Sequence, residues 1–173
     1  MAPLSHAVFG IVLSVSSEPG LDVDIDPGAG LGGGALGAAL TTLIVGAILI
    51  AIAPEYTQRK MIEVLEEPAE SFLYGLFALI ALIVATIALF ITLIGIVVAI
   101  PLFLVSIVVW SVGAAIGYLA IADRLIGHED GWLKPLVVAA AINGGLALTG
   151  VGGLVSLAVG AAGVGAVLRD PLD

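Results

Sequence analysis

The chain has 173 residues, of which 61% are hydrophobic and 11% are charged, and its mean hydropathy is +1.25. Soluble domains contain about 45–50% apolar and about 25% charged residues, so this composition excludes an ordinary soluble domain and predicts an integral membrane protein. The apolar runs are continuous, whereas a membrane barrel alternates apolar and polar residues, so the spans are expected to be helices.

The charge balance of the chain limits the partners that it can bind. There are 14 acidic and 5 basic residues, which gives a net charge of −9. Because phosphate binding requires Lys and Arg, this balance argues against nucleic acid as a partner. Acidic polar segments with few lysines are typical of a halophilic archaeon, whose proteins stay solvated in concentrated salt. The chain contains no cysteine, which excludes a disulfide framework and a thiolate site.

Residues 1–34 are expected to precede the helical membrane domain, which we assign to residues 35–170. Residues 1–17 contain a short apolar core without the basic residues that usually precede the core of a secretory signal. This segment is therefore either a cleaved signal or a retained apolar segment. Residues 18–34 are rich in Pro, Gly and Asp and are expected to form an acidic linker.

The linker contains a partial calcium-binding pattern. Asp22, Asp24 and Asp26 match the D-x-D-x-D opening of a calcium loop. Pro27 stands where the loop requires Gly for its sharp turn, and Gly33 stands where it requires a bidentate Glu. A solvated acidic linker is therefore the simpler interpretation, and no metal or cofactor is predicted.

The first membrane span is expected at residues 35–53, where an apolar run ends at Pro54. Residues 55–67 then place apolar side chains between charges at roughly helical spacing, which predicts an amphipathic helix on the membrane surface. Pro68 follows in the first turn of the next span, where its missing N–H costs little.

A long run without any charged residue follows Glu70. As one helix this run would reach about 78 Å, far beyond a hydrocarbon core of about 30 Å. We therefore expect two spans, at residues 71–92 and 98–122, joined by a tight turn.

The last apolar run begins at Lys134 and is too long for one comfortable span. We expect a Gly-rich helical hairpin with helices at residues 134–148 and 153–168. Each helix would reach only about 22 Å, so the hairpin is short and can be re-entrant. A single kinked helix is the alternative. The predicted fold is an all-α integral membrane protein with three transmembrane helices and this C-terminal hairpin.

Turn residues mark the breaks in both of these runs. In the first break, Thr92 and Gly95 are the best turn residues, and Pro101 fits the first turn of the next helix. In the second break, Thr149 and Gly150 open the segment TGVGG.

The basic residues predict the orientation of the chain. With the terminal hairpin, all five lie on one side of the membrane, which the positive-inside rule assigns to the cytoplasm. A multi-pass protein of the cell membrane is expected, with its N-terminus outside and its C-terminus in the cytoplasm. The five residues are Arg59, Lys60, Arg124, Lys134 and Arg169.

The polar residues of the spans are almost all non-ionisable. Proton relays, ion-coupled pumps and intramembrane enzymes normally keep ionisable side chains in the membrane. Among the polar residues of these spans only Tyr118 is ionisable, so no enzyme is expected. Asn143 is expected to bond to a neighbouring helix rather than to a substrate. His128, Glu129 and Asp130 could bind a metal, although neighbours rarely converge on one ion and a polar loop is the simpler interpretation. The other polar residues of the spans are Thr41, Thr42, Thr86, Thr92, Ser106, Ser111, Thr149 and Ser156.

Small residues recur at four-residue spacing in two of the expected helices. Gly113 and Gly117 form one pair, and Gly152, Ser156 and Gly160 form a longer ridge. Small side chains let helix backbones approach closely, so these residues serve packing within the bundle or a homo-oligomer.

Three segments of the chain follow a recognisable order: APEYTQRKMIEVLEEPAESFLYG, TLIGIVVAIP and TGVGGLVSLAVGAAGVGAVLR. The order resembles the membrane region attached to bactofilin-like, polymer-forming cytoskeletal proteins of prokaryotes, in a haloarchaeal form. The resemblance covers about residues 35–170 and implies a membrane tether for a polymer or a β-solenoid. This chain has no β-solenoid, because only LDVDIDPGAGLGGG stands where the longer proteins carry strands. A tethering role would therefore need a separate partner, or would be carried out through the membrane part alone.

These observations predict a non-enzymatic membrane anchor or scaffold that tethers a cytoskeletal or polymer-forming partner, or another membrane protein. Besides the lipid bilayer, its contacts are expected on the amphipathic helix and on the polar loop at residues 123–134. The alternative is a small permeation or transport protein, because broken helices at membrane depth build substrate sites. The breaks at residues 92–101 and 149–153 are the candidates for such a site.

Overall fold

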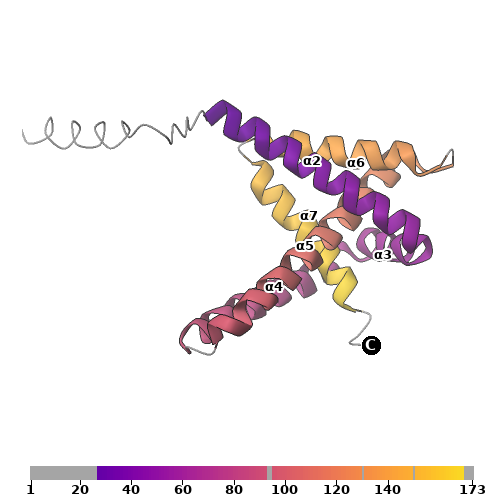
Figure 1. Ribbon diagram of the computed structural model, residues 1–173. Coiled ribbons are helices and arrows are strands. Elements are labelled where there is room, and N and C mark those ends of the chain that lie inside the picture. The colour runs from indigo at the N-terminus through magenta and orange to yellow at the C-terminus, as the bar shows by residue number, and fades with distance from the viewer. Residues whose placement is uncertain (1–26, 93–94, 130, 150, 170–173) are drawn as a thin grey trace, which may run out of the picture. The chain divides into compact units, whose positions relative to one another are not determined.

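The protein is helical throughout the part of the chain that the computed structural model describes (Figure 1). Six helices follow one another there and no strand occurs among them, so the expected all-α fold class is confirmed at this level. The predictions for residues 1–17, the calcium pattern, Asp130 and Gly150 lie outside the described residues. The described ranges are 27–92, 95–129, 131–149 and 151–169.

Four of the helices are long enough and apolar enough to cross a membrane. This number is compatible with a multi-pass membrane protein, and it exceeds the expected three full spans because the last helix alone reaches the length of a span. The candidate spans are Gly32–Ile52, Pro68–Phe90, Val97–Ile126 and Gly152–Arg169.

Helix α2, Pro27–Ile52, is the first described element. It begins inside the expected linker, because a proline can occupy the first turn of a helix without losing a hydrogen bond. The chain divides into two compact units, Met1–Gly30 and Leu31–Asp173. From Leu31 onward, α2 belongs to the same unit as the other helices.

Helices α4, Pro68–Phe90, and α5, Gly95–Ile126, form the first hairpin. At the turn, the Thr92 hydroxyl donates a hydrogen bond to the Leu89 carbonyl oxygen at 3.1 Å. The same oxygen, Thr92 Oγ1, accepts the Gly95 N–H at 3.0 Å. A Cβ at Gly95 would overlap the Leu89 carbonyl, so this tight turn requires a residue without a side chain.

Pro101 lies inside α5 and not in the first turn of the helix, where it was expected. The helix begins earlier because Thr92 accepts the N–H of its first residue. Proline has no N–H, so the carbonyl of Val97, four residues before it, has no helical donor.

Helices α6, Leu133–Ala147, and α7, Gly152–Arg169, form the second hairpin with the same local turn. The Thr149 hydroxyl donates to the Leu146 carbonyl at 2.8 Å, and the Gly152 N–H donates to the Thr149 carbonyl at 3.1 Å. A Cβ at Gly152 would overlap the Leu146 carbonyl. The last apolar run therefore consists of two helices, of which α6 is only about 22 Å long.

Helix α7 packs against α4 with the two backbones in direct contact. A Cβ at Gly75 would overlap the carbonyl of Ala161, and a Cβ at Gly165 would overlap the carbonyl of Ser71. The pairs match in reverse order along the two helices, so α4 and α7 run antiparallel here. Small residues four apart on both helices make this approach possible.

Helix α7 also packs against α5, again through small residues. A Cβ at Gly163 would overlap the carbonyl of Gly113, and a Cβ at Gly117 would meet Val159. Helices α5 and α7 are therefore also antiparallel at this contact, although α4 and α5 are antiparallel to each other. The two helices therefore diverge from their shared turn, and α7 lies across the fork between them, in contact with both.

The main apolar core surrounds the second half of α5. Helix α3, Pro54–Glu66, packs on this half together with α6 and α7. By contrast, the ends of α4 and α5 near their turn expose large apolar side chains, as expected for a surface that faces lipid. The core includes Met61, Val64, Ile116, Tyr118, Leu119, Ala120, Leu136, Ala139 and Ala166.

Candidate functional site

A cavity of about 400 Å³ lies between α2, α5, α6 and α7. Its wall gathers uncharged polar side chains that are scattered along the sequence, and we call it the polar cavity. Ala38, Ala114, Ala147 and Gly153 complete the wall with small apolar surfaces. The polar and aromatic lining residues are Thr41, Thr42, Trp110, Ser111, Tyr118, Asn143 and Ser156.

Asn143 joins α6 to α2 at the cavity. Its Nδ2 donates one hydrogen bond to Thr42 Oγ1 at 2.8 Å and another to the Ala38 carbonyl at 3.2 Å. Because Ala38 offers only a carbonyl oxygen, the amide nitrogen must face α2. Close packing permits these bonds, since a Cβ at Gly144 would touch the Ala35 carbonyl and the Ala39 side chain.

Tyr118 joins α5 to α7 on another part of the wall. Its hydroxyl donates to Ser156 Oγ at 2.7 Å, and its side chain is among the largest that are fully buried. Both residues lie close to the contact of Gly117 with Val159, which brings the two helices together. A hydrogen bond between two side chains thus crosses the interface beside the contact of the backbones.

The structure brings six of the polar residues singled out from the sequence to this one cavity: Thr41, Thr42, Ser111, Tyr118, Asn143 and Ser156. It does not bring the others there. Thr86 and Ser106 lie between α4 and α5, where each hydroxyl donates to a carbonyl of its own helix. Thr92 and Thr149 lie in the two turns.

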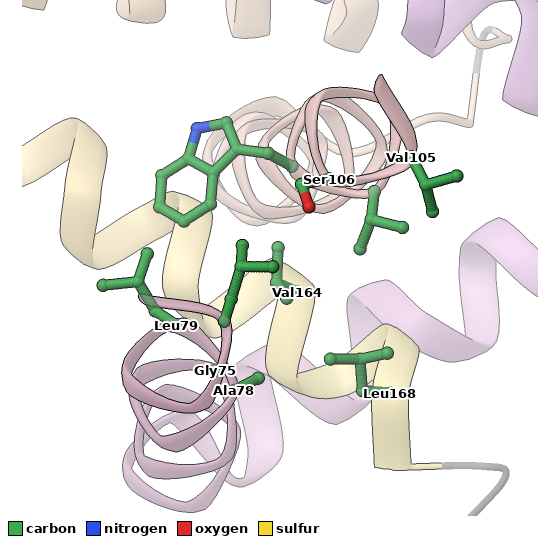
Figure 2. A pocket seen from close by; sticks show the side chains of 10 residues that line it. Gly75, Ala78, Leu79, Val105, Ser106, Val164 and Leu168 are labelled. Atoms are coloured by element: carbon green, nitrogen blue, oxygen red, sulfur yellow. The ribbon is translucent and has the colours of Figure 1, made fainter. Parts of the chain in front are cut away.

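A second, smaller cavity of about 160 Å³ lies at the fork between α4, α5 and α7, and its wall is mostly apolar. Figure 2 shows Gly75, Ala78 and Leu79 on one helix, with Val105 and Ser106 on another. Val164 and Leu168 complete the wall from the third helix (Figure 2).

Trp110 lines both cavities, and sequence reasoning gave it no role. A Cβ at Gly160 would touch its indole ring, so the small residue on α7 makes room for the large one on α5. Trp110 thus separates the polar cavity from the apolar one. The sequence offers a faint signal for this arrangement, because Trp110 precedes Gly113 by one helical turn.

Helix α3 has two distinct faces. Thr57, Lys60, Met61 and Val64 are buried on one face, against α5 and α7. Met61 and Val64 of the expected apolar stripe are therefore covered by protein, whereas Ile62 is 51% exposed. The opposite face is exposed and consists of Glu55, Arg59, Ile62 and Glu66, and we call it the outer face of α3.

Lys60 is buried although it carries a charge. Its side chain is 0% exposed, and its Nζ lies 2.8 Å from Glu63 Oε2 and 5.9 Å from the centre of the Tyr56 ring. A buried charge is costly unless it is paired, so these groups hold Lys60 in one position.

The ends of α4 and α7 meet through charged groups. Arg169 forms ion pairs with Glu67 and, at 3.4 Å, with Glu70. The last residue of α7 thus lies beside the first turn of α4. These contacts are partly exposed, and they extend the antiparallel packing of the two helices.

The loop after α5 is organised by His128. Its Nδ1 lies 2.6 Å from Asp123 Oδ1, and its ring stacks on Trp132 at 4.5 Å between centres. Among the described residues no group of three or more His, Cys, Asp or Glu side chains is placed to hold a metal ion. Asp130, the third residue of the predicted metal pattern, lies outside the described part.

The residues predicted to pack helices lie in three different places. Gly113, Gly117, Ser156 and Gly160 lie in the contact of α5 with α7, whereas Gly152 contacts the end of α6. Asn143 bonds to α2. Sequence reasoning missed the contact of α4 with α7, although the four-residue spacing of its small residues was readable. The missed residues are Ser71, Gly75, Ala161 and Gly165.

One family model matches residues 3–172 and is described as a domain of unknown function, DUF8173. The chain belongs to the DUF8173 family. No curated protein and no solved structure matches it. The match to DUF8173 extends over both hairpins and both cavities, and it assigns no activity to them. The resemblance to bactofilin-like membrane regions stays a prediction.

Proposed function

We propose that the protein is a non-enzymatic membrane anchor or scaffold that holds a partner protein at the membrane through the outer face of α3. The observation that carries this proposal is the way in which α3 packs on the other helices. Its apolar face is buried against α5 and α7, so this face is not available to lipid. The charged outer face is then the one that remains for water and for a partner.

The rest of the molecule suits an anchor. The apolar side chains near the first turn, such as Ile83, Ile87 and Phe103, are about half or more exposed and match a lipid environment. Lys60 and Met61 are buried, so α3 is already packed on the bundle before a partner docks, which lowers the entropy cost of docking. The orientation that supports this role has α3, the loop after α5 and the C-terminus in the cytoplasm.

The test is site-directed cross-linking in native membranes, because the chain has no cysteine of its own. The variant Ile62→Cys carries the cross-linker on the outer face of α3, and the variant Ile83→Cys carries it on the exposed surface of α4. We expect Ile62→Cys to cross-link one protein of defined mass, and we expect Glu66→Lys to weaken that product. Purification through a C-terminal tag in mild detergent and high salt should retain the same protein.

Identical cross-linking patterns at Ile62→Cys and Ile83→Cys would contradict this proposal. So would a product that is unchanged by Glu66→Lys and by charge reversal at Glu55. A polymer-forming or cytoskeletal protein in the product would support the tethering role that the resemblance implies.

The polar cavity favours a second candidate function, a small permeation protein. Ala147 and Gly153, which flank the second break, line this cavity. No residue of the first break lines either of the two cavities described above. Solute flux into vesicles that contain the purified protein tests this candidate, and flux equal to that of empty vesicles would reject it.

A further inference from the structure

The polar cavity carries hydrogen-bonding capacity that the protein itself does not use. Asn143 uses both N–H groups of its amide on Ala38 and Thr42. Within the described part of the chain, its carbonyl oxygen Oδ1 accepts no hydrogen bond. An amide acceptor therefore remains at the wall of the cavity.

Two hydroxyl groups on the wall have protons to donate. Thr42 Oγ1 accepts its hydrogen bond from Asn143, and Ser156 Oγ accepts its hydrogen bond from Tyr118. As acceptors, both groups keep their own O–H proton, and among the described residues neither proton is donated to a protein group. A hydroxyl can rotate to suit a partner, so both donors can turn toward the cavity.

The size and charge of the cavity limit what it can hold. Its volume of about 400 Å³ falls in the range of small-molecule sites, roughly 300–1,000 Å³. None of its lining side chains is Asp, Glu, Lys, Arg or His. A charged ligand would lose its hydration there without a counter-charge, which is unfavourable. An uncharged polar ligand avoids this cost.

We propose that the polar cavity is a binding site for a small, uncharged, hydroxyl-bearing solute of the polyol type. Each hydroxyl of such a solute both donates and accepts, which matches the donors at Thr42 and Ser156 and the acceptor at Asn143. The carbon skeleton packs on Trp110 and the small apolar residues of the wall. This binding is independent of the proposed anchor function and requires no permeation.

Two cysteine variants of the full chain test the proposal. Ala147→Cys places a thiol in the polar cavity, and Ala78→Cys places one in the apolar cavity, both at half-buried alanines. The variants are reconstituted in phospholipid nanodiscs, where both membrane faces are open to a water-soluble thiol reagent. Labelling is then followed against increasing erythritol or glycerol.

We expect polyol to slow the labelling of Ala147→Cys in a saturable way and to leave Ala78→Cys unchanged. At twice its dissociation constant, a competing solute slows labelling about threefold by mass action. Thr42→Val keeps the shape of the side chain and removes the hydroxyl, so it should shift the protection to several-fold higher polyol. Ser106→Ala, which removes a hydroxyl from the apolar cavity, should leave the protection unchanged.

Four outcomes would overturn the proposal: no labelling of Ala147→Cys, labelling that polyol does not slow, equal slowing at Ala78→Cys, or protection unaltered by Thr42→Val. Protection only after diacylglycerol is added to the nanodiscs would also overturn it, because the occupant would then be the glycerol part of a lipid. If Thr42→Val elutes as an aggregate, Ser156→Ala tests the same donor role from α7.

Discussion

The two hairpins use the same turn, but away from the turn their helices are buried to different extents. In α4–α5 the pattern Leu89, Thr92, Gly95 closes the turn, and in α6–α7 the pattern Leu146, Thr149, Gly152 closes it with corresponding hydrogen bonds. Large apolar side chains are exposed beside both turns, among them Phe90 and Leu154, whereas α7 is buried along most of its second half and α4 is buried only at Ser71 and Gly75.

The turn of each hairpin is decided by local residues, whereas the burial of its helices is decided by the helices that pack against them. A threonine that bonds back to a carbonyl three residues earlier, followed by a glycine, ends a helix in either place. What distinguishes the second hairpin is the run of small residues on α7, which lets its backbone enter the fork of the first.

The largest effect is expected where α7 enters the fork. In Gly163→Leu the new side chain overlaps the carbonyl of Gly113, so the second hairpin cannot seat between α4 and α5. We expect the free energy of unfolding to fall by about 3 kcal/mol or more, the upper end of overpacking costs. Thermal unfolding in detergent measures it. Gly153→Leu is the control, because a Cβ there has no neighbouring atom within 4 Å, and an equal loss in both variants would reject the fork.

The next effect tests whether the turns are equivalent. Gly95→Ala and Gly152→Ala each place a methyl group against a carbonyl, of Leu89 and of Leu146. We expect each to lower the free energy of unfolding by about 1–3 kcal/mol, with similar values for the two. Denaturant titration of both variants measures the difference. A much larger loss at Gly152 would mean that the surroundings, rather than the local pattern, hold the second turn.

A smaller effect is expected from the bond between α6 and α2. Asn143→Leu removes the hydrogen bonds to Thr42 and Ala38, and we expect a loss of about 1–2 kcal/mol, the range for polar contacts between membrane helices. Thr41→Val is the control, because the Thr41 hydroxyl bonds only to Gly37 of its own helix. The same thermal assay compares the two. Equal stability of Asn143→Leu and the unaltered chain would show that this bond contributes nothing.

The smallest effect concerns the ion pairs between the ends of α4 and α7. Arg169→Gln removes the charge that faces Glu67 and Glu70. Partly exposed pairs contribute about 0.2–1 kcal/mol, and salt screens them. We expect a small loss of thermal stability in dilute buffer that disappears in molar salt. A loss that persists in molar salt would point to packing of the arginine stem instead of charge.

Much of the secondary structure could be predicted from the residues alone. The uncharged run after Glu70 is too long for one helix, and Thr92 with Gly95 is enough to locate its turn. Two predicted helix starts were wrong. Helix α2 begins at Pro27, because a proline fits the first turn of a helix. Helix α5 begins at Gly95, before Pro101, because Thr92 accepts the N–H of its first residue. The amphipathic pattern of α3 was readable, but the pattern does not distinguish lipid from protein as the cover of its apolar face.

Composition and local pattern were enough to predict helices long and apolar enough to cross a membrane, the turns between them and the small residues at four-residue spacing. These follow from hydropathy and from local hydrogen bonding, which act within a few residues. Only the tertiary structure decided that α7 lies in the fork of α4 and α5, and that Thr42, Tyr118, Asn143 and Ser156 share one cavity. The physical reason is that a small residue permits a close approach without specifying which helix approaches.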